Sequence, residues 1–188
     1  AMCGRFANAI LEAFGRAVRK LEVAGARISR LSVPALAEVM PLSGILFTSE
    51  AYGTWKTEIE AAPEKMFPEI LQRFRSGKDN SAADYVGAWQ AVHAARAAWA
   101  PATAPFAGVL TPTAALLPPD RTRLETEDAY FKQANLLTLR NTRVGNLMGL
   151  CGLTLPTGAP SCVLQILGRR FGERALLRVG AAVEAALA

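Results

Sequence analysis

The chain has 188 residues, a formal net charge of +5 and 51% hydrophobic residues. This length fits one domain, so we predict a single domain over residues 1–188, and the hydrophobic content excludes a disordered chain. No apolar run reaches the about 18 residues needed to cross a bilayer, and the N-terminus lacks the pattern of a secretory signal peptide. We therefore expect a cytoplasmic protein. Ala1 before Met2 has the form of an expression-tag remnant.

The few cysteines and the lone histidine limit metal and thiol chemistry. Cys3, Cys151 and Cys162 form no Cys-x-x-Cys pair, and His93 is the only histidine. A four-ligand zinc site cannot be built from them without carboxylates, so we expect no metal, and we expect no cofactor. Buried structural thiols are the main interpretation. Thiol catalysis, with His93 as the base for Cys151 or Cys162, is the alternative.

The basic charge raises the question of nucleic-acid binding. Arginines are spread along the predicted helices, and the densest group runs from Arg169 to Arg178. Solvated helix faces account for this distribution, so we do not expect nucleic acid as a partner. Direct binding of tRNA through Arg169 to Arg178 is kept as an alternative.

Four segments open the chain. Apolar residues from Phe6 to Leu21 recur at helical spacing, and Gly25 follows as a C-cap. Residues 26–33, ARISRLSV, mix apolar and polar side chains and predict a strand. Pro34 starts a short helix, and a longer helix is predicted over residues 44–54.

The middle of the chain is predicted to be helical. Residues 63–74 form one short helix. Ser81 with Asp84 makes a capping box that starts a long helix, and Pro101 is predicted to end it.

The last third brings the predicted strands together. Residues 108–112 predict a short buried strand, and residues 126–139 predict a helix. The stretch 141–168 is rich in Gly, Pro and Asn but keeps two apolar runs, LCGLTLP and CVLQIL, which predict two strands joined by tight turns. A final amphipathic helix covers residues 173–187. These elements predict an α/β fold with a mixed β-sheet flanked by helices.

Several local sequences resemble the C-terminal half of the amidase-signature family. They are KLEVAGARI (20–28), GVLTPTAALLPP (108–119) and NLLTLRNTRVGNLMGLCGLTLPTG (135–158), followed by the second Gly-rich strand and the last helix. In this order they cover nearly the whole chain, from Phe6 to Leu187. The resemblance implies a partial amidase-signature fold, related to bacterial amidases and to the A subunit of glutamyl-tRNA amidotransferase.

The same resemblance implies an amide-hydrolysing ancestry without its catalytic residues. Members of the family use a serine nucleophile, a second serine in a cis peptide and a lysine base, all from the N-terminal half. Here the serines stand singly without a Gly-rich loop, and the lysines lie on polar helix faces or in loops. A serine without a positioned base is a weak nucleophile. We therefore assign no catalytic residue and predict a truncated protein that is inactive alone.

One wall of the substrate pocket is what the resemblance leaves to this chain. The candidate substrate-binding residues follow the first predicted strand or lie in the loop before the second: Thr111, Pro112, Thr113, Arg140, Asn141, Arg143 and Asn146. The alternative is that the asparagines only cap turns and that the arginines are exposed.

Two positions depart from the family pattern. Cys151 stands where a proline is common, and Val163 replaces the usual glycine after Pro160. A β-branched valine would be strained if that position required a positive φ.

An incomplete sheet predicts a partner. A strand edge and an apolar face left uncovered would favour a homo-oligomer. Alternatively, the chain is a non-catalytic subunit of a split amidase or amidotransferase, and it completes the pocket of a partner chain that carries the N-terminal half. We expect no membrane partner.

Overall fold

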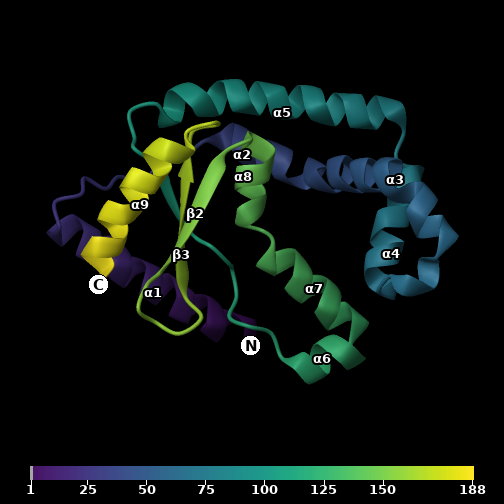
Figure 1. Cartoon of the computed structure of the whole chain (residues 1–188), viewed down its shortest axis with the longest axis horizontal. Helices are drawn as coiled ribbons and strands as arrows, with labels where there is room; N and C mark the ends of the chain where they lie inside the picture. The colour runs from purple at the N-terminus through teal and green to yellow at the C-terminus, as the bar shows by residue number, and fades with distance from the viewer. Residues whose placement is uncertain (1) are drawn as a thin grey trace. The chain divides into compact units, whose positions relative to one another are not determined.

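The computed structural model describes the backbone of residues 2–188 and the side chains of residues 8–188. The chain forms two compact units, one containing the N-terminal stretch up to Ser32 together with residues 102–188, the other residues 33–101 (Figure 1). Phe6 and Cys3 lie outside the described side chains. In the described part, no helix is both long and apolar enough to cross a membrane.

The first unit is built on a three-stranded sheet. Its strands are β1 (Val109–Pro112), β2 (Cys151–Pro156) and β3 (Val163–Gly168), in the order β1-β3-β2. Both pairs are antiparallel. The strands agree with the sequence prediction, and the α/β class is confirmed, with antiparallel pairing throughout this part of the sheet.

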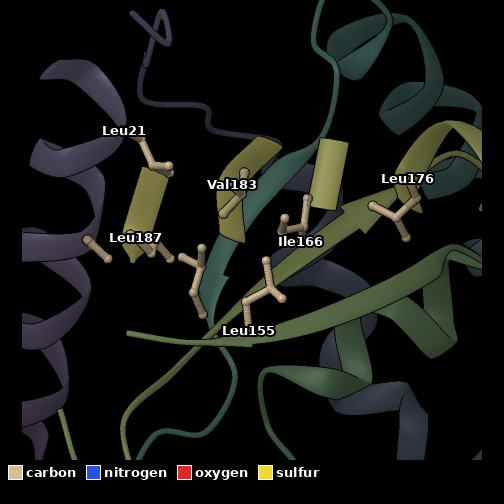
Figure 2. Close-up of a cluster of buried hydrophobic side chains, with 8 residues drawn as sticks. Leu21, Leu155, Ile166, Leu176, Val183 and Leu187 are labelled. Atoms are coloured by element: carbon tan, nitrogen blue, oxygen red, sulfur yellow. The ribbon is translucent and has the colours of Figure 1, made fainter. Parts of the chain in front are cut away.

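Two helices cover one face of the sheet. They are α1 (Met2–Val23) and α9 (Glu173–Leu187), and their apolar stripes meet alternate residues of β2 and β3 (Figure 2). Leu164 and Ile166 are fully buried there. Since burying one such side chain contributes about 1.5–3 kcal/mol, this cluster is the main source of stability for the unit.

Three short helices follow β1. They are α6 (Arg121–Thr126), α7 (Asp128–Thr138) and α8 (Thr142–Met148). The predicted helix 126–139 is thus confirmed from Asp128 onward, while α6 and α8 were predicted as loops. The chain leaves helical geometry at Glu127 (φ −126°, ψ 94°), and α8 ends at Gly149, whose φ is +67°.

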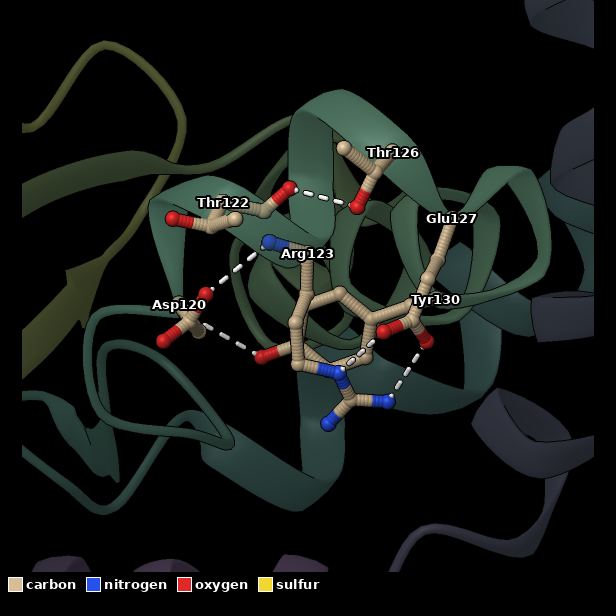
Figure 3. Close-up of polar contacts among 6 residues, drawn as sticks. All are labelled: Asp120, Thr122, Arg123, Thr126, Glu127 and Tyr130. Carbon is tan, nitrogen blue, oxygen red and sulfur yellow. Dashed lines mark hydrogen bonds and ion pairs between the residues drawn. The ribbon is translucent and has the colours of Figure 1, made fainter.

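A polar corner joins α6 to α7 (Figure 3). Asp120 caps α6 by accepting a 2.9 Å hydrogen bond from the Arg123 backbone N–H, and the Asp120 N–H donates to the Tyr130 hydroxyl at 3.1 Å. The Arg123 guanidinium donates twice to the Glu127 carboxylate, each bond 2.8 Å, and lies 3.9 Å from the centre of the Tyr130 ring. These contacts fix the direction in which α7 leads toward α8.

The second unit is helical. Its elements, in chain order, are α2 (Pro34–Val39), the 3₁₀ turn Met40–Leu42, α3 (Ser43–Ala61), the 3₁₀ turn Pro63–Lys65, α4 (Pro68–Arg75), the 3₁₀ turn Ser76–Asp79 and α5 (Ala82–Thr103). The predicted capping box is confirmed, because the Asp84 N–H donates to the Ser81 hydroxyl at 3.0 Å.

The turn before α5 is fixed to α3. The Asn80 side-chain amide donates to the Thr48 and Ser49 hydroxyls at 3.0 and 2.9 Å. A Cβ on Gly77 would lie 2.0 Å from the Thr48 carbonyl oxygen. Only glycine permits this close approach of two backbone segments.

Several sequence predictions were wrong in detail. Residues 26–33 form no strand with any described residue, because a strand needs a neighbour to pair with. The helix predicted from residue 63 begins at Pro68, since a proline disfavours helical geometry in the residue before it, and Phe67 is extended (ψ 127°). Pro101 does not end the long helix but lies within its last turn.

Candidate functional site

The end of β1 and the start of α8 are held together by one hydrogen bond. The Asn141 side-chain amide donates to the Pro112 carbonyl oxygen at 2.8 Å, across 29 positions of sequence. Asn141 precedes the first residue of α8 but does not cap it with its side chain. The structure therefore brings the two groups of predicted site residues into contact at Asn141 and Pro112.

Three polar side chains gather on the sheet face opposite the apolar cluster. Thr111 and Gln165 are register partners on β1 and β3, and Thr113 lies two residues beyond Thr111. Because side chains alternate across a strand, all three emerge on one face. We call Thr111, Thr113 and Gln165 the Gln165 cluster. Its backbone continues the ladder, since the Thr113 N–H donates to the Val163 carbonyl at 3.1 Å.

The Gln165 cluster contains buried oxygens that lack partners. The two threonine hydroxyls and Gln165 Oε1 are buried from solvent and have no hydrogen-bond partner among the described residues. Gln165 as a whole is only 6% exposed. A buried polar group left unpaired costs about 1–3 kcal/mol, so such a cluster normally has a binding or structural role.

Two glycines border the Gln165 amide. A Cβ on Gly152 of β2 would lie 3.5 Å from Gln165 Nε2, and one on Gly145 of α8 would lie 3.9 Å from it. Gly145 is buried, whereas Gly152 is exposed. Thr154, the register partner of Gln165 on β2, is exposed too. The cluster is thus closed on the α8 side and adjoins an open sheet face on the β2 side.

The remaining predicted residues lie around this arrangement rather than in it. Arg140 is exposed, and its Nε is 3.4 Å from Asn141 Oδ1. Asn146 is exposed on α8, and Arg143 is half-buried on the same helix. These three side chains therefore surround the Asn141 contact, while the unpaired oxygens belong to the Gln165 cluster.

Gln165 was missed by the sequence analysis. Its signal was a single polar residue inside the apolar run CVLQIL, which was interpreted only as a buried strand. The suspected strain at Val163 is absent, because the left-handed residue of this turn is Ser161, with a φ of 59°.

Ionisable groups with shifted pKa values lie in other parts of the chain. A hydrogen bond from Arg123 lowers the pKa of Glu127, and a hydrogen bond from Arg75 lowers that of Glu60. Both pairs stabilise local structure. Within the described residues, no group of three His, Cys, Asp or Glu side chains gathers as a metal site would require.

Several serines and a lysine have local hydrogen-bond partners. The Ser43 and Ser76 hydroxyls donate to backbone carbonyls three residues earlier, at 2.8 and 2.7 Å, and the Ser81 hydroxyl donates to Asp84 at 2.6 Å. Lys20 Nζ donates to the Leu187 carbonyl at 2.8 Å, at the end of α9. These four side chains act in helix ends and turns.

Comparison with known proteins places this arrangement in a wider group. No protein-family model matches the chain. The 2-amino-5-chloromuconic acid deaminase of Comamonas testosteroni is 28% identical over 182 residues, which are 94% of this chain and 39% of the deaminase. Solved structures extend the likeness to the fold, and a crystal structure of an amidase superposes with a TM-score of 0.79 at 22% identity over 98% of this chain. The predicted resemblance to the amidase-signature family is confirmed.

Other amidase-signature relatives show the same partial coverage. The allophanate hydrolase of Kluyveromyces lactis gives a TM-score of 0.80 at 17% identity, and this chain covers 30% of it. The glutamyl-tRNA(Gln) amidotransferase of Thermotoga maritima gives, for its A subunit, a TM-score of 0.62 at 21% identity, with 38% covered. The chain spans about two fifths of the length of the curated relative it matches.

Proposed function

We propose that this chain forms one wall of an amidase-type substrate pocket and hydrolyses no amide alone. The carrying observation is that 94% of the chain matches only 39% of its deaminase relative. The serine nucleophile and the lysine base would come from outside these 188 residues.

The chemistry needed for hydrolysis supports this division. A serine hydroxyl attacks an amide only when a positioned base takes its proton. The tetrahedral oxyanion needs prearranged donors, and removing one such donor costs about 3–4 kcal/mol. The hydroxyls of Ser43, Ser76 and Ser81 donate instead to nearby carbonyls or to Asp84, which is a capping role.

The pocket wall itself would consist of the loop after β1 and the start of α8. The hydrogen bond from Asn141 holds the Pro112 carbonyl in place, and Thr113 follows directly on the chain. A wall must be rigid to orient a substrate, because small displacements of a bound group lower the rate strongly. In this proposal Asn141 is a positioning residue.

We further propose that the N-terminal portion of an amidase fold covers the segment 26–33, on the same natural chain or on a partner subunit. Ile28 and Leu31 in this segment are each 37% exposed. No described residue pairs with its backbone as a strand. A segment whose backbone N–H and C=O groups lack strand partners is ready to pair with another strand.

The test is co-expression with the remaining N-terminal portion of the Comamonas deaminase, followed by co-purification and assay of ammonia release. We expect a complex that hydrolyses amides, while each part alone does not. The double variant Ile28→Ser, Leu31→Ser should lose the complex, and the matched variant Arg27→Ser, Arg30→Ser should keep it.

Two outcomes would redirect the proposal. If the chain never associates with the N-terminal portion and has the mass of a dimer in solution, the homo-oligomer takes the place of the split amidase. If the chain alone releases ammonia, the proposal that it lacks a nucleophile is wrong.

A further inference from the structure

The Gln165 cluster has the chemistry of a small binding site. Gln165 Oε1 can only accept a hydrogen bond, Nε2 can only donate, and each threonine hydroxyl can do both. The three buried oxygens have no partner among the described residues, and Gln165 is only 6% exposed. A group that pairs with Gln165 Oε1 must carry an N–H or O–H donor.

The backbone around the cluster leaves space for the Gln165 amide. Glycine stands on both sides of it, at Gly145 on α8 and at Gly152 on β2. The Asn141 bond to Pro112 fixes the strand end that carries Thr111 and Thr113. The polar atoms are therefore held by two strands and a helix.

Three kinds of small polar head group can be compared at this cluster. A carboxylate offers only acceptors, so Gln165 Oε1 would stay unpaired beside it. An ammonium offers only donors, so it could not pair with Nε2. A primary carboxamide carries one acceptor and two donors in one plane, and it can form two hydrogen bonds with another amide.

We propose that Gln165, with Thr111 and Thr113, binds the primary carboxamide of a substrate and distinguishes it from the carboxylate of the hydrolysed product. This inference rests on the proposed function, because it assigns the substrate head group to the same pocket wall. A polar site that loses a partner rejects the wrong ligand strongly, because its own buried groups stay unpaired.

Entry to the cluster is from the β2 side. Gly152 and Thr154 are exposed there and adjoin Gln165. The last side-chain torsion of glutamine is broad, so rotation of the amide can turn Oε1 from the interior toward this face. A bulkier residue than glycine at position 152 would narrow the entry.

The test follows the Gln165 side-chain amide by nuclear magnetic resonance in ¹⁵N-labelled protein, during titration with propionamide and, separately, propionate. The variant Gln165→Met, which keeps the length of the side chain, assigns the signal by removing it. We expect a saturable shift with propionamide and binding of propionate at least about tenfold weaker. Thr113→Val should weaken propionamide binding about three- to tenfold, the loss of one neutral hydrogen bond.

A matched control shows whether the shift arises at this cluster. Gln133→Met changes an exposed glutamine on α7 and should leave the titration unchanged. No shift of the Gln165 signal, an equal response to both ligands, or a fixed water that no amide displaces would each overturn the proposal. The titration needs no hydrolysis, so its failure is distinguishable from failure of the co-expression experiment.

Discussion

The Asn141 side chain should stabilise the first unit through a single contact, and replacing it tests how the site is held. In Asn141→Ala the donor to the Pro112 carbonyl oxygen at 2.8 Å is removed. A net hydrogen bond contributes about 0.5–1.5 kcal/mol, and a buried carbonyl left unpaired adds a desolvation cost. Since this bond is only partly buried, we expect a loss of about 1–2 kcal/mol in the free energy of unfolding.

The assay is urea denaturation followed by circular dichroism. For a chain of this size, each 1 kcal/mol lowers the Tm by about 2–4 °C, so a thermal scan should show a drop of roughly 2–8 °C. Asn146→Ala is the matched control, because it removes an exposed asparagine from the adjoining helix α8, and it should change stability by no more than about 0.5 kcal/mol. Equal effects of the two variants would refute the assigned role of the Asn141 bond.

The variant Asn141→Asp gives the same test a pH dependence. The introduced carboxylate would face the Pro112 carbonyl oxygen, which disfavours the anion and raises the pKa of the new group in the folded state. A raised folded pKa means that stability is greatest below the unfolded pKa and is lost as pH rises through the folded pKa. We expect this variant to approach the wild type below about pH 4 and to fall behind it at neutral pH. A gap that is independent of pH would contradict the geometry.

Three further predictions follow from the packing and the ion pairs. Gly77→Ala should destabilise the second unit by at least about 1–3 kcal/mol, because the new Cβ would lie 2.0 Å from the Thr48 carbonyl oxygen; a variant with wild-type stability in urea would contradict this contact. Ile166→Ala should cost about 2–5 kcal/mol, since the side chain is fully buried, and a loss below about 1 kcal/mol by the same measurement would exclude its place in the core. The pKa of Glu60 is lowered by its hydrogen bond from Arg75, so the stabilisation it gives is present above the usual carboxyl range and is lost as pH falls through the lowered pKa. The difference in urea midpoint between wild type and Glu60→Gln should therefore shrink as pH falls from about 7 to about 3, and a constant difference would exclude the ion pair.

Local patterns predicted most elements of the first unit. The two apolar runs in the Gly-rich stretch correspond to β2 and β3, and the final helix has the predicted bounds 173–187. These segments were predictable because each carries its own periodicity and is bounded by glycine or proline. The predicted strand at 26–33 failed for the opposite reason, since strand formation depends on a distant partner as well as on the local pattern.

The candidate site was predicted only in part. Thr111, Thr113 and Asn141 were identified through the family resemblance, and the structure brings their segments together. Gln165 was not identified, because its importance depends on register with Thr111 across two strands, which the sequence does not show. A polar residue in a buried run is the one local sign of such a position.

The most direct test of the central proposal is ammonia release from a panel of aliphatic and aromatic carboxamides by the purified chain. We expect no release above that of buffer from the chain alone, and release after co-expression with an N-terminal amidase portion. Turnover by the chain alone that survives rigorous removal of host amidases would contradict the proposal, because a nucleophile within these 188 residues would then have to exist.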